Sequence, residues 1–377
     1  VQAIYDRRRE ELKEIMAQRR AQKAAWAQAN PQLAEKLERF FSGKIPAIDW
    51  DGIKQKAGSP TRAGSSAVLS VLAENIENMI CASADLCNSD KTDGFLKKTH
   101  AFAYHDFTGA FLQAGVAELT MACCCIGMAL HGGVIASCGT FFVFSDYMKP
   151  ALRMAALMEL PVKFIWSHDA FRVGEDGPTH QPVEQETQVR LLEKMKNHSG
   201  RNSMLVLRPA DVEEATQAWK LAMENTNTPT GLIFSRQNVD NLPAGNDYKQ
   251  AARGAYIVAG SDDNPDVTLV ASGSEVSTLV AGAALLRQDG VKVRIVSVPS
   301  EGLFRSQSKE YQDSVIPAGG KIFGLTAGLS FAMQDLVGLN GKVWGLDYFG
   351  YSAPYKVLDE KFGFTAQNVY EQVKQML

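Results

Sequence analysis

The sequence predicts an α/β protein whose two domains each hold a mostly parallel sheet flanked by helices. Short apolar runs alternate with helix-length runs from about residue 59 to 242, and the same alternation returns on a smaller scale over 253–377. Strands that alternate with helices of this length are typical of βαβ units and therefore of parallel sheets. The 377 residues, of which 45% are hydrophobic and 21% charged, are enough for more than one hydrophobic core.

Residues 1–57 differ in composition from the rest and predict a helical linker. They are dense in Arg, Lys, Glu and Ala. Asn30 followed by Pro31 is typical of a helix start, and Phe40 and Phe41 belong to an apolar stripe that follows it. Because these two rings need burial, we expect the segment to pack against a larger body rather than to project as a free helical arm.

Residues 58–245 carry the longer run of alternating elements. The predicted helices are 61–78, 114–130, 146–158 and 211–225, and the predicted strands lie in MICASAD, VIAS, VKFIWSH, MLVLRPA and TGLIF. The stretch NLPAGND then marks a boundary. The second unit, residues 246–377, is predicted to contain helices 274–287 and 365–376 and strands in VTLVASGS, VKVRIVSV, KIFGLT and GKVWGL.

Charge and hydrophobicity exclude several classes of partner. A net charge of −3 and a pI near 6.1 leave no basic footprint for nucleic acid, and no basic tract indicates a membrane surface. The longest apolar run, Met121–Leu130, is too short to span a bilayer. The charged, helical N-terminal run does not resemble a signal peptide, which favours a cytoplasmic protein.

None of the six cysteines forms a CxxC pair, and Cys123–Cys125 stand in an apolar helical run. We therefore expect the cysteines to be buried and reduced.

The loop from His168 to Glu186 is the most polar and turn-rich connection in the chain. It follows the apolar run VKFIW, so in a parallel sheet it lies at the carboxyl edge, where ligands bind. Two histidines and several carboxylates could bind a metal, but no third ligand stands at a suitable spacing, and we predict no metal ligands in this chain. The loop is predicted to bind a substrate instead.

Seven motifs in order resemble the transketolase family. They are SADL (83–86), FFVFSDY (141–147), GEDGPTHQPVEQ (174–185), LRPAD (207–211), SRQN (235–238), ASGSE (271–275) and FGFT (362–365). The resemblance implies a thiamine-diphosphate-binding fold, with a pyrimidine-binding domain over 58–245 and a Rossmann-like C-terminal domain over 246–377. It also implies a transferase that moves a two-carbon ketol unit between ketose and aldose phosphates in the pentose phosphate pathway.

Glu118 is the only charged residue from Ala114 to Leu130, and burial of a lone carboxylate is expected to raise its pKa. By resemblance, Glu118 is the catalytic glutamate that shares a proton with the aminopyrimidine ring of the cofactor. The alternative is a first-turn glutamate that stabilises the helix dipole. Ala117 occupies a place where the family commonly has an arginine, so the charge around Glu118 differs from the usual pattern.

The resemblance implies further contacts with the cofactor and the substrate. The aromatic pocket for the pyrimidine ring would comprise Phe141, Phe144 and Tyr147, and the residues near the cofactor would include Asp85 and Leu86. The residues that match phosphate-contacting positions are Arg62, Ser89 and Arg236. The residues that match contacts to sugar hydroxyl groups are Asp176 and the two catalytic histidines, His168 and His180.

No GDG motif followed by Asn, which holds the diphosphate through Mg²⁺ or Ca²⁺ in this family, occurs in the sequence; GEDG at 174–177 belongs to the substrate loop. The resemblance therefore implies that the diphosphate-binding domain lies outside this chain and that the chain alone is inactive. It also implies a homodimer with active sites between subunits. The chain would be a fragment of a longer transketolase; the alternatives are one subunit of a split enzyme or a non-catalytic dimerisation partner.

Overall fold

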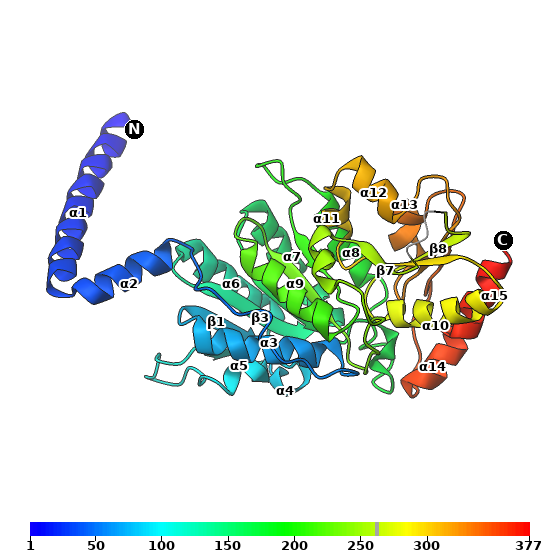
Figure 1. The fold of residues 1–377 in the computed structure, drawn as a ribbon. Helices are drawn as coiled ribbons and strands as arrows, with labels where there is room; N and C mark the ends of the chain where they lie inside the picture. The colour runs from blue at the N-terminus through cyan, green and yellow to red at the C-terminus, as the bar shows by residue number, and fades with distance from the viewer. Residues whose placement is uncertain (261–263) are drawn as a thin grey trace.

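The computed structural model describes residues 1–260 and 264–377 and shows two sheets flanked by helices, with a helical arm at the N-terminus (Figure 1). The larger sheet is parallel throughout, in the order β2-β1-β3-β4-β6-β5. Its strands are β1 Met79–Ser83, β2 Phe111–Gln113, β3 Ile135–Phe141, β4 Lys163–Ser167, β5 Leu205–Leu207 and β6 Thr230–Phe234.

The smaller sheet has the order β11-β10-β8-β9-β7, and only the edge strand β7 runs antiparallel to its neighbour. Its strands are β7 Tyr256–Ala259, β8 Val267–Ala271, β9 Val293–Ser297, β10 Ile322–Leu325 and β11 Lys342–Trp344. The predicted fold class, two mostly parallel sheets flanked by helices, is confirmed.

Helices cover both faces of the larger sheet. The helices of this part are α3 Thr61–Asn75, α4 Cys87–Asp90, α5 Asp93–Leu96, α6 Glu118–His131, α7 Ser145–Leu157, α8 Gln185–Lys194 and α9 Val212–Glu224, with 3₁₀ turns η1 Phe142–Phe144 and η2 Phe171–Val173. In β4, Phe164 and Trp166 pack into the core beneath α6 and α7, whereas Ile165 packs into the core beneath α3 and α9. A strand buried on both faces explains why this run is apolar without alternation.

The smaller sheet has its own helices. They are α10 Glu275–Gln288, α11 Glu301–Arg305, α12 Lys309–Val315, α13 Gln334–Val337, α14 Tyr355–Phe362 and α15 Ala366–Lys374, with 3₁₀ turns η3 Tyr248–Arg253 and η4 Ser330–Met333. Helices α10 and α15 pack closely together, because Gly282 lets Val369 approach the backbone of α10. No helix of the described residues combines the length and hydrophobicity needed to cross a bilayer.

Several elements differ from the sequence-based predictions. The predicted helix 61–78 ends at Asn75, and the short helices α4, α5, α11, α12, α13 and α14 were not predicted. The predicted helix 114–130 begins at Glu118, because β2 precedes it and Gly115 has φ 69°. The strands β2 and β7 were not predicted. They are three and four residues long, too short for a clear pattern.

The prediction that all the cysteines are buried is wrong. Cys123 and Cys124 are exposed on α6, whereas Cys125 is buried against β3. Leu119 and Leu130 of the same helix are 45% and 60% exposed. A helix that covers one face of a sheet buries a single stripe, and consecutive residues point about 100° apart. Helix α6 therefore presents an apolar outer face.

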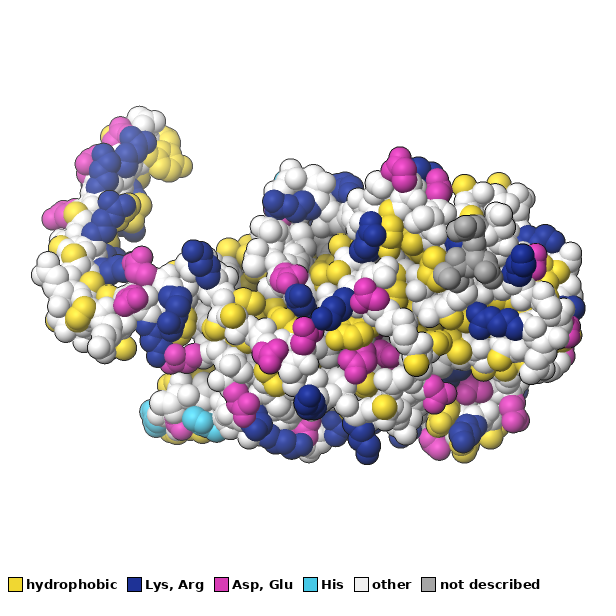
Figure 2. Space-filling model, viewed as in Figure 1, with side chains coloured by type: hydrophobic (Ala, Val, Ile, Leu, Met, Phe, Trp, Pro, Cys, Tyr) yellow, Lys and Arg dark blue, Asp and Glu magenta, His cyan; other side chains and the backbone are white. Residues whose placement is uncertain are grey.

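The first 41 residues form a projecting helical arm, the alternative that the sequence favours less (Figure 1). Its helices are α1 Gln2–Ala29 and α2 Pro31–Phe41, and neither has a buried residue. Phe41 is 52% exposed although its ring lies against Gly133, and Phe40 is only half-buried. The expectation that the segment packs against a larger body is therefore wrong for α1 and α2. It holds for the end of the segment, where Ile45, Ile48, Trp50 and Ile53 pack against the core of the larger sheet. Figure 2 shows Lys/Arg and Asp/Glu side chains interspersed along the arm.

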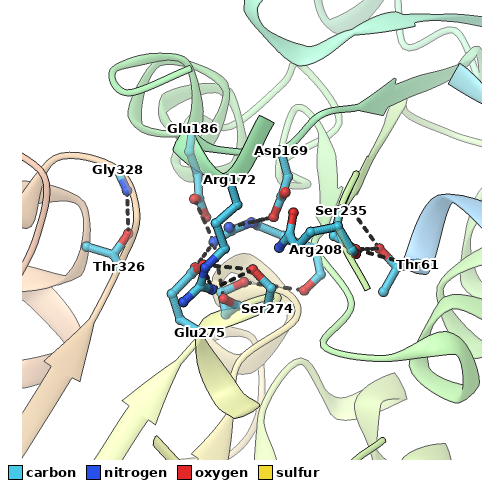
Figure 3. Close-up of polar contacts among 12 residues, drawn as sticks. Thr61, Asp169, Arg172, Glu186, Arg208, Ser235, Ser274, Glu275, Thr326 and Gly328 are labelled. Carbon is cyan, nitrogen blue, oxygen red and sulfur yellow. Dashed lines mark hydrogen bonds and ion pairs between the residues drawn. The ribbon is translucent and has the colours of Figure 1, made fainter. Parts of the chain in front are cut away.

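A buried cluster of ion pairs joins the two sheets (Figure 3). Arg208, which directly follows β5, is 1% exposed and contacts three carboxylates: Asp169 at 2.7 Å, Glu186 at 3.2 Å and Glu275 at 2.5 Å. Burial alone would lower the pKa of Arg208, but the three carboxylates raise it well above its usual value. Glu275 belongs to α10, so this arginine links the larger sheet to the second unit.

Backbone contacts reinforce this junction. The amide of Gly273 donates to the carbonyl of Arg208 at 3.1 Å, and the amide of Arg208 donates to the carbonyl of Pro299 at 2.9 Å. Gly273 has φ 65°, and a Cβ there would stand 2.7 Å from the Arg208 Nε. The ASGSE turn is therefore a structural turn that receives the arginine.

We predict that Arg208→Met destabilises the protein by about 3–5 kcal/mol, because it leaves three buried carboxylates without their shared cation. Urea unfolding followed by circular dichroism measures this loss. Arg8→Met is the matched control: Arg8 pairs with Glu11 on the exposed arm at 3.0 Å, and its removal should cost less than about 1 kcal/mol. Equal effects of the two substitutions would contradict the role given to Arg208.

Candidate functional site

Five loops converge at the carboxyl edge of the larger sheet. They follow β1, β2, β3, β4 and β6, which all point the same way. In an open α/β sheet this edge is where ligands bind. The loops carry the predicted site residues Asp85, Leu86, Ser89, Glu118, Phe141, Phe144, Tyr147, His168, Asp176, His180 and Arg236, and Arg62 joins them from the first turn of α3.

Two arginines lie together at this edge. The Thr61 amide donates to the Ser235 Oγ at 3.0 Å, and the Ser235 amide donates to the Thr61 Oγ1 at 2.7 Å (Figure 3). These two hydrogen bonds fix the positions of Arg62 and Arg236, because each arginine directly follows one of the bonded residues. Burial and then the charge of Arg236 lower the pKa of Arg62. Within the described residues, neither guanidinium pairs with a carboxylate, so the two like charges suit an anionic ligand.

His168 is held by the same group of residues. Arg62 donates from Nη1 to the Ser89 carbonyl at 2.7 Å and lies 3.4 Å from the His168 Nε2. Because arginine can only donate, this Nε2 accepts, and Nδ1 carries the proton that it donates to the Ser167 Oγ at 2.8 Å. Burial, then the charges of Arg62 and Arg236, lower the pKa of His168 to about 2.

At neutral pH, His168 is therefore a neutral imidazole whose Nε2 can accept a hydrogen bond from a ligand hydroxyl. It cannot act as an imidazolium acid there. Its φ of 62° is uncommon for a residue other than glycine and sets the direction of the loop that follows.

Aromatic rings form a continuous row beside His168. The Phe141 ring stacks on the imidazole at 3.6 Å between centroids, and Phe144 stacks on Phe141 at 5.9 Å. Tyr147, 63% exposed, lies 6.0 Å from Phe144, and His180 meets the edge of Phe144 at 5.4 Å. The structure thus brings together the three predicted aromatic residues and both histidines.

Glu118 is buried at the start of α6, where it is 6% exposed. The Thr140 Oγ1 donates to its Oε1 at 3.2 Å, and the ring of Phe141 follows Thr140 at the end of β3. The positive end of the helix dipole favours a carboxylate at this place. A buried carboxylate with one hydroxyl partner, beside stacked rings, fits an aminopyrimidine ring that needs a hydrogen-bond acceptor and an apolar face.

Three predicted residues lie at this edge without a described contact to the cluster. Asp85 has φ 64° and is exposed, and Leu86 is half-buried at the start of α4. Asp176 is exposed in a loop that the C-terminal unit holds: Gln181 Nε2 donates to the carbonyls of Gly174 and Tyr351, both at 2.9 Å.

Sequence reasoning missed Thr140, Asp169 and Arg172 as residues that support the site. Thr140 donates a hydrogen bond to Glu118. Asp169 directly follows His168 and accepts a hydrogen bond from Arg208. Arg172 donates to Asp359 at 2.6 Å and to the Thr278 Oγ1 at 3.1 Å. The sequence held a signal for them, namely a polar residue among apolar neighbours. Thr140 lies in a buried strand, Asp169 lies just after one, and Arg172 lies in a 3₁₀ turn.

Among the described residues, no group of three or more His, Cys, Asp or Glu side chains is arranged to hold a metal ion.

A parallel sheet with a carboxylate, aromatic rings and a pair of cations at its carboxyl edge defines the class: an α/β protein with a small-molecule site of enzyme type. The family model for the pyrimidine-binding domain of transketolase matches residues 58–241, and the model for the transketolase-like C-terminal domain matches residues 254–365. The transketolase of Bacillus subtilis (strain 168) is 40% identical over 365 residues, which are 95% of this chain and 53% of that relative.

Solved structures agree with these matches. The transketolase from Leishmania mexicana superposes with a TM-score of 0.88 at 32% identity, over 98% of this chain and 53% of that chain. The transketolase from Pichia stipitis in complex with sedoheptulose 7-phosphate superposes with a TM-score of 0.86 at 33% identity, over 97% of this chain and 53% of that chain.

The chain belongs to the transketolase family, a family of transferases that use thiamine diphosphate. It spans about half the length of the curated relatives it matches.

The free energy of unfolding is expected to fall between pH 7 and pH 5. We predict that His168→Asn makes this fall smaller by about 2 kcal/mol. The unfolded chain protonates this histidine near its usual pKa of 6.5, whereas the folded protein does so only near pH 2. The unfolded state therefore binds more protons between these values, and stability falls as the pH falls. Asparagine does not titrate in this range, and it tolerates a positive φ.

The free energy of unfolding in urea at several pH values measures this difference. His198→Asn, at an exposed histidine, is the matched surface control. If the free energy of unfolding of His168→Asn depended on pH as that of the wild type does, His168 would be protonated normally in the folded state.

Proposed function

We propose that this chain provides the pyrimidine-binding side and the C-terminal part of a transketolase. That enzyme reversibly transfers a two-carbon ketol unit from a ketose phosphate to an aldose phosphate. The observation that carries the proposal is Glu118, a buried carboxylate at the start of a helix, with the Phe141–Phe144 row and the Arg62–Arg236 pair at the same sheet edge. The domain boundaries that we propose are 1–57, 58–245 and 246–377.

Glu118 would share a proton with the pyrimidine ring of thiamine diphosphate, because a buried carboxylate without a cationic partner accepts hydrogen bonds strongly. Phe141, Phe144 and Tyr147 would stack against that ring, and Asp85 and Leu86 would border it. When bound, thiamine diphosphate supplies a carbon centre that stabilises the electrons released when a bond next to a carbonyl breaks.

Arg62 and Arg236 would bind the terminal phosphate of the sugar, with the hydroxyl of Ser89 as a further donor. A phosphate would relieve the repulsion between the two guanidinium groups, which the charge of Asp90 offsets only in part at Arg62. The neutral Nε2 of His168 would accept from a sugar hydroxyl, and His180 and Asp176 would contact further oxygens of the substrate. His180 would also assist proton movement in the transfer.

The diphosphate end of the cofactor, with Mg²⁺ or Ca²⁺, would be held by residues outside this chain. We propose a homodimer in which that part completes each site. The exposed apolar face of α6 and α7 favours a second copy: Leu119, Leu130, Met154 and Leu157 are 45%, 60%, 44% and 45% exposed. The proposed location is the cytoplasm, where unpaired cysteines such as Cys123 and Cys124 stay reduced.

The test is two-carbon transfer from xylulose 5-phosphate to ribose 5-phosphate with thiamine diphosphate and Mg²⁺. We expect no transfer by the chain alone, and transfer when a diphosphate-binding half of the family is added. Glu118→Gln should lower the restored rate by about 10²–10⁴-fold, because the proton on the pyrimidine is no longer controlled. Glu224→Gln, at an exposed end of α9, is the control and should be fully active.

Light scattering on the active mixture should give the mass of two copies of each half. Transfer by the chain alone would contradict the need for a second half, and equal rates for the two glutamine variants would remove Glu118 from the mechanism. A mass of one copy of each half would contradict the dimer.

We predict that Arg236→Ala raises the KM for ribose 5-phosphate by roughly 10–100-fold, because a charge-assisted hydrogen bond to phosphate is lost. The KM for unphosphorylated ribose, measured in the same reconstituted enzyme, should change by less than about threefold. Arg236→Lys should recover part of the loss, since it keeps the charge but not the planar fork. Equal effects on both sugars would show that Arg236 does not read the phosphate.

A further inference from the structure

A pocket of about 170 Å³ lies at the amino edge of the larger sheet, opposite the edge that carries the candidate site. Its walls come from the starts of β3 and β4, the end of α9 and the turn after α6. Phe40 and Phe41, at the end of α2, line it as well. The volume is smaller than that of a drug-sized site, so the pocket has room for a molecule of a few carbon atoms. Nothing in the proposed transfer reaction uses this pocket.

Lys163, the first residue of β4, lines the pocket and is only 2% exposed. Its Nζ donates to the carbonyl of Asn225, another lining residue, at 2.6 Å. The amine therefore lies where two walls of the pocket meet. Within the described residues, no carboxylate lines the pocket, and Lys163 forms no ion pair. Lysines are almost never fully buried without such a partner, so this one is unusual.

The surroundings of Lys163 favour its uncharged form. An ammonium group has three N–H donors, and the Asn225 carbonyl satisfies one of them, which leaves two without an acceptor in the described chain. Burial lowers the pKa of Lys163 to about 7. A neutral amine that donates one N–H to Asn225 keeps its lone pair free. A desolvated lysine of this kind is a nucleophile.

The walls of the pocket are mainly apolar. Ile45, Ile135 and Met223 belong to the core on the face of the sheet that α3 and α9 cover, and Pro161 lies just before β4. Lys44, which is exposed, is the other lining cation in the described part of the chain, and it disfavours a second positive charge nearby. These walls suit a small apolar chain better than a sugar, whose hydroxyl groups would need polar partners.

We propose that Lys163 forms a reversible imine with a small apolar aldehyde or ketone held in this pocket. The Nζ lone pair attacks the carbonyl carbon, a C=N bond replaces the C=O bond, and the oxygen leaves as water with the two hydrogens of the amine. When the imine nitrogen takes up a proton, it can again donate to the Asn225 carbonyl. The site lies at the opposite edge of the sheet from the Glu118 cluster and does not depend on the function proposed above.

The probe is propanal with sodium cyanoborohydride, which reduces an imine to a stable amine, on the intact chain at pH 7. We expect Lys163 to be alkylated at least about tenfold faster than the exposed Lys54, as measured by peptide mass spectrometry. Lys163→Met, which keeps an apolar chain of similar length, should lose this fast adduct in whole-protein mass spectrometry. Lys54→Met is the matched control and should keep it.

Alkylation of Lys163 no faster than that of Lys54 would overturn the proposal, because the amine would then be protonated or out of reach. This comparison uses the wild-type chain, so it holds even where Lys163→Met does not fold. A fast adduct that persists in folded Lys163→Met would also overturn the proposal. Glyoxylate is an anionic aldehyde of similar size, and a larger ratio of the Lys163 rate to the Lys54 rate with glyoxylate than with propanal would overturn the apolar class of ligand.

Discussion

The buried guanidinium of Arg208 is the constraint on which the arrangement of the molecule depends. It is 1% exposed and lies within 3.2 Å of carboxylate oxygens of Asp169, Glu186 and Glu275, which belong to a loop, a helix of the first unit and a helix of the second. A charge taken out of water is tolerated only when its partners stand in the right geometry, so the cluster fixes how the two sheets meet. Removal of one member would leave the others uncompensated.

This constraint reaches the candidate site because Asp169 follows His168 directly. The Arg208–Asp169 pair holds the start of the loop, the positive φ of His168 turns it, and Arg172 anchors it again through Asp359 of the C-terminal unit. The C-terminal unit thus contributes no described contact to Glu118, yet it determines where the loop over residues 168–186 lies. A scaffold that holds functional loops from two sides keeps their geometry without relying on the loop itself.

The sequence was enough to predict the class of fold, the longer helices and strands, and the sheet edge that carries the site. Long apolar runs such as VKFIW and TGLIF have strong local signals, and β4 and β6 follow them closely. The predictions that were wrong concern features that depend on tertiary contacts. Whether Cys123 or Phe41 is buried depends on which neighbours cover it, and the pairing of Arg208 with Glu275 joins residues far apart in the chain. No local pattern contains that information.

The charges at the sheet edge are separated in a way that a composition cannot reveal. Glu118 is buried with a hydroxyl partner at one place. Arg62 and Arg236 stand together at another, without a salt bridge to a carboxylate among the described residues, and the neutral His168 and the aromatic row lie between the two places. Unpaired like charges and a lone buried carboxylate each cost stability in the free protein. A fold that keeps both at one edge, while it gives Arg208 three carboxylate partners, leaves that edge suited to a charged ligand.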